Sequence, residues 1–154
     1  MTGSPALFAK SFEAAQRWIN ELMRDLRVDD PQVAYRALRA TLHALRDRLT
    51  PEEAVDLGAQ LPTLVRGIYY EGWRPAATPQ RSRHPQEFFD RVGRELVAER
   101  DPSPQAATRS VFRLLAGHVT EGEVADIVGM LPEPLRELWP LAGAAHETPA
   151  PMRR

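Results

Sequence analysis

A repeat within the chain constrains its fold more than any other feature of the sequence. The segment at residues 61–66 reads LPTLVR and recurs at residues 131–136 as LPEPLR. Upstream of it, residues 50–57 read TPEEAVDL and recur at residues 120–127 as TEGEVADI. Both pairs are separated by 70 positions. A unit of this length that occurs only twice is typical of a duplicated helical bundle, because solenoid units are shorter and more numerous.

The prolines indicate where helices begin. Proline is tolerated in the first helical turn, where its missing N–H would have no intrahelical partner. Four of the 14 prolines follow a residue that can cap a helix, in the pairs Asp30-Pro31, Thr50-Pro51, His84-Pro85 and Ser103-Pro104. Thr50 with Glu53, and Thr120 with Glu123, fit the capping-box pattern. Pro62 and Pro132 are expected to separate a third helix from a fourth in each half.

Apolar residues between these signals recur every three or four positions, which predicts amphipathic helices. Strand-like alternation is not found in the sequence. We therefore predict an all-α fold of about eight helices, arranged as two tandem pseudo-symmetric four-helix repeats packed in one bundle. The predicted order is a flexible tail at 1–9, a first repeat at 10–73, a linker at 74–83, a second repeat at 84–141 and a flexible tail at 142–154.

Composition excludes several classes of function. The chain has no cysteine, so disulfides, thiolate metal sites and cysteine nucleophiles are excluded. A formal net charge of −1 argues against a protein whose main task is to hold a nucleic-acid backbone. The chain does not begin with a basic stretch followed by an apolar run, and no segment approaches a membrane span in length. We expect a cytoplasmic location and no membrane partner.

Three segments resemble a known family. They are LPTLVRGIYYEGWRP at residues 61–75, PQRSR at residues 79–83 and EFFDRV at residues 87–92. These segments are similar to the signature, the linker and the start of the second half in the bacterial family called domain of unknown function 2267. The similarity covers roughly residues 10–140. The resemblance implies a bacterial, helical, stress-associated protein, and it implies no catalytic residues.

The first candidate site consists of an acid and an arginine that recur in both halves. Asp56 and Arg66 have Asp126 and Arg136 as their counterparts. One interpretation is a symmetric anion or partner site, because arginine presents paired donors. The other is a structural salt bridge that joins the third helix to the fourth in each half. We favour the salt bridge, because retained ion pairs are usually structural.

The second candidate is an aromatic cluster at the end of the first repeat. Tyr69 and Trp73 are one helical turn apart, and Trp139 is the counterpart of Tyr69, so we expect position 69 to lie in the core. Tyr70 and Trp73 could form an exposed aromatic surface for a partner. Alternatively, Trp73 folds back and packs against the linker, which we favour because aromatics at helix ends usually pack.

The third candidate is the arginine-rich linker with the helix that follows it. Its members are Arg74, Arg81, Arg83, His84, Arg91 and Arg94. A basic loop that leads into a helix N-terminus can bind phosphate or nucleic acid. Few aromatic residues interleave with these arginines, so a solvated linker is the interpretation we favour.

Recognisable catalytic and metal-binding motifs are not found. None of the four histidines has a partner at metal-ligand spacing, and there is no nucleophile elbow, phosphate loop or dinucleotide fingerprint. Glu121, Glu123 and Asp126 crowd one predicted helix start, which the helix dipole favours on its own. We expect no enzyme activity, no metal and no cofactor.

The sequence thus predicts a non-enzymatic helical interaction module, stress-associated if the resemblance holds. Its contact surface would be Tyr70, Trp73 and the linker arginines, and its partner another protein or a second copy of the chain. The alternative is a nucleic-acid or anion binder that uses the arginine-rich linker. A third hypothesis is a small-molecule site between the two halves.

Overall fold

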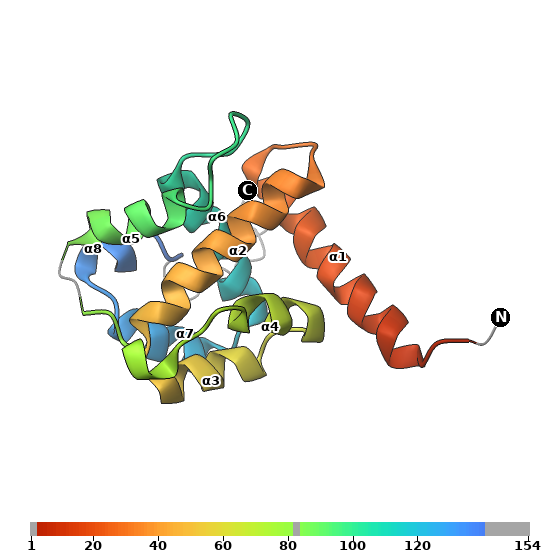
Figure 1. Cartoon of the computed structure of the whole chain (residues 1–154), viewed down its shortest axis with the longest axis horizontal. Coiled ribbons are helices and arrows are strands. Elements are labelled where there is room, and N and C mark those ends of the chain that lie inside the picture. Colours follow the sequence, from red (N-terminus) through yellow and green to blue (C-terminus); the bar gives the residue numbers. More distant parts are fainter. Residues whose placement is uncertain (1–2, 82–83, 141–154) are drawn as a thin grey trace, which may run out of the picture.

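The computed structural model describes residues 3–81 and 84–140. Within these residues the protein has eight α-helices, one short 3-10 helix and no strand, which confirms the predicted all-α class. The elements, shown in Figure 1, are α1 Ala6–Leu26, α2 Pro31–Arg48, α3 Pro51–Ala59, α4 Thr63–Tyr70, η1 Pro75–Ala77, α5 Pro85–Gly93, α6 Pro104–His118, α7 Glu121–Gly129 and α8 Glu133–Arg136.

The predicted helix starts are confirmed at all four prolines, which open α2, α3, α5 and α6. At α3 and α7 the threonine caps also form. Thr50 Oγ1 accepts the amide of Glu53 at 3.3 Å, and Thr120 Oγ1 accepts the amide of Glu123 at 3.4 Å. The reciprocal half of the capping box is replaced at α7, because the amide of Thr120 donates to Gln60 Oε1 at 2.8 Å. The Glu123 side chain is therefore not used in the cap.

The long helix α2 runs through the middle of the molecule (Figure 1) and contacts α1, α4, α5 and α6. Its apolar residues Leu38, Leu42 and Leu45 have no exposed surface. Arg46 is only 2% exposed, and its guanidinium donates to the carbonyl oxygens of Tyr69 at 2.8 Å and Glu71 at 2.7 Å. A charged group is tolerated there because it satisfies carbonyls at the end of α4.

The contacts between helices link the two halves of the sequence. Helix α1 packs on α6, α2 packs on both α5 and α6, and α3 packs on α7. The bounds of α3 and α7 differ by 70 residues at both ends, as the sequence repeat does. The arrangement as two pseudo-symmetric four-helix repeats stays a prediction, which these matched bounds support.

The start of the first helix differs from the prediction. Helix α1 begins at Ala6, so residues 6–9 are helical and the tail predicted at 1–9 is too long. The segment has no apolar periodicity and carries glycine and proline, which predicts a tail, yet Ala, Leu and Lys favour a helix without burial. The tail predicted at 142–154 lies outside the described residues. None of the described helices combines the length and the apolar composition that crossing a membrane requires.

Candidate functional site

Large apolar side chains are exposed at the N-terminal end of α1. Leu7, Phe8 and Phe12 are 60%, 62% and 61% exposed, whereas Trp18 and Leu22 further along the same helix are buried. In Figure 1 this end of α1 extends beyond the other helices. Helix α1 is therefore anchored by its C-terminal half, and its first two turns present apolar side chains to solvent.

An apolar groove continues this surface between α1, α2 and α4. It has a volume of about 280 Å³. Its lining is Phe12, Ala15, Gln16, Ile19, Tyr35, Leu38, Leu64, Val65 and Ile68. Leu64 on its rim is 45% exposed. We call Leu7, Phe8, Phe12 and the lining of this groove the α1–α4 apolar face. Contiguous exposed apolar surface of this kind is typical of binding sites for proteins. The sequence alone does not indicate this face, because a tail at 1–9 would leave Leu7 and Phe8 outside the first helix.

The aromatic pair does not form an exposed surface of this kind. The Tyr70 ring lies between those of Tyr69 and Trp73, with centroid distances of 4.9 and 5.3 Å. Its hydroxyl lies over Gly58, where a Cβ atom would overlap it. Trp73 is half-buried against the core, and Tyr69 and Trp139 are buried. Tyr69 therefore lies in the core as expected, whereas Trp73 packs against the core, and its packing against the linker stays a prediction.

The two recurring arginines bind backbone rather than the recurring acids. Arg66 donates from Nε to the carbonyl of Gly58 at 2.8 Å and from Nη2 to that of Leu61 at 2.9 Å. Arg136 likewise donates to backbone carbonyls, from Nε to that of Leu131 at 2.6 Å and from Nη2 to that of Gly129 at 3.2 Å. The predicted salt bridges to Asp56 and Asp126 are therefore wrong. The last carbonyls of a helix lack partners and attract positive charge, so each arginine caps the helix before it.

The linker arginines lie in separate environments. Arg74 and Arg81 are exposed, and Arg83 lies outside the described residues. Arg91 forms ion pairs with Asp47 at 3.8 Å and Glu95 at 3.0 Å. The predicted basic cluster is thus divided, because part of it is neutralised within the fold.

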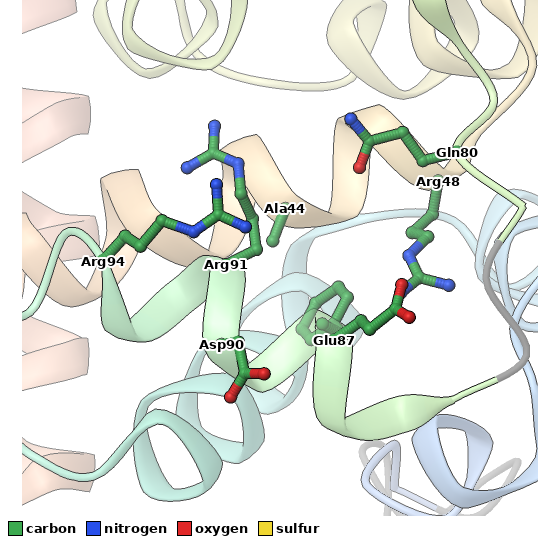
Figure 2. Close-up of a pocket in the computed structure, with 8 residues that line it drawn as sticks. Ala44, Arg48, Gln80, Glu87, Asp90, Arg91 and Arg94 are labelled. Carbon is green, nitrogen blue, oxygen red and sulfur yellow. The ribbon is translucent and has the colours of Figure 1, made fainter.

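Arg91 and Arg94 line a small opening of about 190 Å³ beside α2 and α5 (Figure 2). Glu87 and Asp90 line it as well, so its charges are mixed. Figure 2 shows Arg48 pointing toward Glu87. Burial lowers the pKa of Arg48, and the charge of Glu87 acts in the opposite direction. Acids among the lining residues reduce the attraction of this opening for an anion.

A wider opening of about 610 Å³ separates the linker from the α7–α8 region. Arg48, Arg81 and Arg136 line it, together with seven neutral residues: Thr50, Pro79, Gln80, Gly129, Met130, Leu131 and Pro132. Residues from both halves of the sequence meet there, as the small-molecule hypothesis expects. We call it the linker opening.

Carboxylates from α3 and α7 meet where these helices pack. One oxygen each from Glu53, Asp56 and Glu123 lies within 4.8 Å of the others. Burial raises the pKa of Glu53, and burial together with the charges of Glu53, Asp56 and Asp126 raises that of Glu123 to about 7. Among residues 3–81 and 84–140, these are the ones best placed to hold a metal ion. The sequence repeat contained a signal for them, since Glu53 and Asp56 recur as Glu123 and Asp126, but we attributed the glutamates to capping.

Taken together, these features define an all-α protein with an exposed apolar helix face and a carboxylate cluster between two helices. The sequence model of the family described as "Uncharacterized conserved protein (DUF2267)" matches residues 15–138. The chain therefore belongs to this family, as its signature segments predicted. No curated protein sequence matches the chain.

Proposed function

We propose that the protein is a non-enzymatic helical interaction module whose docking surface is the α1–α4 apolar face. The observation that carries the proposal is the exposure of Leu7, Phe8 and Phe12, each about three-fifths accessible, beside an apolar groove. Exposing large apolar side chains to water is unfavourable, and a partner that covers them removes that cost. The stress-associated role that the family resemblance implies is part of this proposal, as is the cytoplasmic location expected from the sequence.

The occupant that we propose for this face is a second copy of the chain. The projecting half of α1 supplies apolar side chains, and the groove at its base can receive them. A two-fold pair would place the projecting helix of each copy over the groove of the other, which is the self-complementary contact that dimers use. A formal net charge of −1 produces little repulsion between copies.

Molar mass in solution tests this proposal. We expect a dimer with a micromolar dissociation constant, which corresponds to about −8 kcal/mol. The double variant Phe8→Ser, Phe12→Ser should be monomeric by size-exclusion chromatography with light scattering. Val97→Ser is the matched control, because Val97 is 83% exposed and lies elsewhere on the surface. A wild-type protein that stays monomeric at about 1 mM would show that self-association is wrong.

Anion binding at the linker opening is the second candidate function. It is favoured by one observation: among the described residues, three arginines and no acid line that opening. Arg81 is exposed, whereas Arg136 already donates to two carbonyls. Inorganic phosphate should shift the amide resonances of Arg81 and its neighbours at low salt, and the shifts should disappear in Arg81→Ala. Unchanged resonances in the wild-type protein would contradict this candidate.

A further inference from the structure

We propose that Glu53, Asp56 and Glu123 form a binding site for a hard divalent cation between α3 and α7, with Ca²⁺ as the ion that fits best. The site is independent of the α1–α4 apolar face, and the sequence alone predicts no metal. Three kinds of observation support it: the positions of the oxygens, the buried carboxylate of Glu123, and the charge that the surrounding residues leave unbalanced.

The positions of the oxygens fit a shared cation. All three ligand atoms lie within 4.8 Å of one another. Two oxygens bound to one Ca²⁺ ion can be as far apart as twice the metal–oxygen distance, or about 5 Å. The ligands are all carboxylates, which suit Ca²⁺, Mg²⁺ and Mn²⁺ rather than softer ions. Ca²⁺ tolerates irregular geometry, whereas Mg²⁺ requires an octahedron at shorter distances.

Glu123 provides an observation that is independent of the cluster itself. Its side chain belongs to a residue that is only 8% exposed, and Oε1 is buried without a hydrogen-bond partner. Oε2 of Glu53 is buried without a donor in the same way, and the two carboxyls can hydrogen-bond to each other only if one of them is protonated. Burying a carboxylate oxygen without a partner is costly, so such an atom in a folded protein calls for a ligand. The capping box does not supply one, because Gln60 accepts from the amide of Thr120.

The surrounding residues leave the charge of the cluster unbalanced. Residues 3–81 and 84–140 form no ion pair with Glu53, Asp56, Glu123 or Asp126. Arg66 and Arg136, which the sequence repeat pairs with Asp56 and Asp126, donate to backbone carbonyls instead. The N-terminal ends of α3 and α7 each contribute only about half a positive charge. A divalent cation would supply the remainder.

Asp126 extends the site without being one of its three ligands. It is exposed, and its charge acts on both Glu53 and Glu123. It therefore raises the local negative potential that attracts a cation. Because Glu53 and Asp56 recur as Glu123 and Asp126, each of the two helices contributes the same pair of acids to the contact.

The alternative explanation of the cluster is a proton shared between Glu53 and Glu123. Such a pair balances part of the charge without any metal, and it predicts no response to divalent cations at all. Binding measurements on the full chain near pH 8 separate the two, because a shared proton is weakest there.

Isothermal titration calorimetry and thermal unfolding with CaCl₂, MnCl₂ and MgCl₂ test the proposal. We expect one Ca²⁺ ion per chain, a dissociation constant no weaker than about 1 mM, and a higher unfolding temperature with Ca²⁺. Glu123→Gln should weaken binding at least about tenfold, and Asp56→Asn should weaken it as well. Glu52→Gln is the matched control, because Glu52 is exposed on the first turn of α3 and is not a ligand.

Two results would overturn the proposal. The first is a wild-type protein that binds none of these cations at about 10 mM, which would leave the shared proton as the explanation. The second is equal binding by the wild-type protein and Asp56→Asn, which would place the ion elsewhere. Asp56 is exposed, so this variant keeps the test decisive even if Glu123→Gln fails to fold.

Discussion

Glu95 and Glu123 are both largely buried, and the fold treats their charges in opposite ways. Glu95 forms ion pairs with Arg39 and Arg91 and lies 3.4 Å from His43 Nδ1. Burial on its own would raise the pKa of Glu95, but the hydrogen bond and charge of His43, with the charges of Arg39 and Arg91, lower it. Glu123 has only acidic neighbours in the cluster, and its pKa rises to about 7.

The difference shows which buried carboxylate has its charge balanced by other side chains of the protein. Around Glu95 the chain supplies the counter-charges, so that carboxylate joins α2 to the segment after α5 and needs nothing from solution. Around Glu123 the residues that the structure describes supply none, so we expect a proton or a cation from solution to balance this charge. Burial alone therefore does not distinguish a structural carboxylate from a binding carboxylate, whereas its charged neighbours do.

Removing the Glu95 carboxylate, whose charge is balanced by its neighbours, should have the largest effect on the free energy of unfolding. We expect Glu95→Gln to lower the free energy of unfolding by about 3 kcal/mol, because His43, Arg39 and Arg91 lose their shared partner. Urea denaturation at pH 7 measures this loss. Glu99→Gln is the control, since Glu99 is exposed four residues away. Equal stability of the two variants would mean that the ion pairs of Glu95 do not stabilise the fold.

The pH dependence of stability should reveal the unbalanced charge of Glu123. The folded-state pKa of Glu123 lies above its ordinary value of 4.5, so the folded protein holds this proton more tightly than the unfolded chain. In buffer without divalent cations, stability should fall by about 2 kcal/mol as the pH rises from about 5 to about 8. Urea denaturation across this range should show the fall in the wild-type protein and a smaller one in Glu123→Gln.

Glu95 contributes in the opposite direction and in a different pH window. Its lowered pKa means that its stabilising effect is lost as the pH falls below its ordinary value of 4.5. The two carboxylates are therefore separable by pH. Parallel curves for the wild-type protein and Glu123→Gln between pH 5 and 8 would contradict the assignment of this window to Glu123.

Neutralising Glu123 should change the free energy of unfolding by a smaller amount, and in the stabilising direction. At pH 8 without divalent cations, Glu123→Gln should raise the free energy of unfolding by about 1 kcal/mol, because the repulsion from Glu53, Asp56 and Asp126 is removed. The same substitution type therefore has opposite signs at positions 95 and 123. Thermal unfolding in chelator-treated buffer measures it, and a destabilised Glu123→Gln would contradict the comparison.

Breaking the exposed ion pair between Asp25 and Arg113 should have the smallest effect on stability among these substitutions. Its atoms approach to 2.8 Å, but both side chains are exposed to solvent, at 32% and 46%. Asp25→Asn should lower the free energy of unfolding by no more than about 0.5 kcal/mol, since solvent screens such pairs. A loss of stability as large as that of Glu95→Gln would show that burial does not determine how much an ion pair stabilises this fold.

Local features of the fold could be predicted from the sequence because local rules govern them. Proline at the first helical position and threonine at the cap determine where α3 begins, and each acts within one turn. The same rules failed at the start of α1, where the helix has no buried face to produce a periodic signal. Its exposed residues Leu7, Phe8 and Phe12 form the docking surface that we propose.

The sites could be predicted only in part, because they depend on contacts between distant segments. The repeat identified Arg66 and Arg136 as recurring residues, but the residue types did not show that their partners are backbone carbonyls. It also contained Glu53 and Glu123, whose carboxylates meet only because α3 packs on α7. Tyr70 was predicted as a candidate for exposure, and its contact with Gly58 is likewise invisible in the sequence.

The most direct test of the central claim is a titration of the glutamate side-chain carboxyl carbons by NMR, in buffer without divalent cations. We expect the carboxyl of Glu123 to titrate near pH 7 and that of Glu95 below its ordinary value of 4.5. These two shifts in opposite directions would establish that the fold balances one buried carboxylate and leaves the other for a ligand. Titration of both carboxyls near their ordinary value would contradict the account.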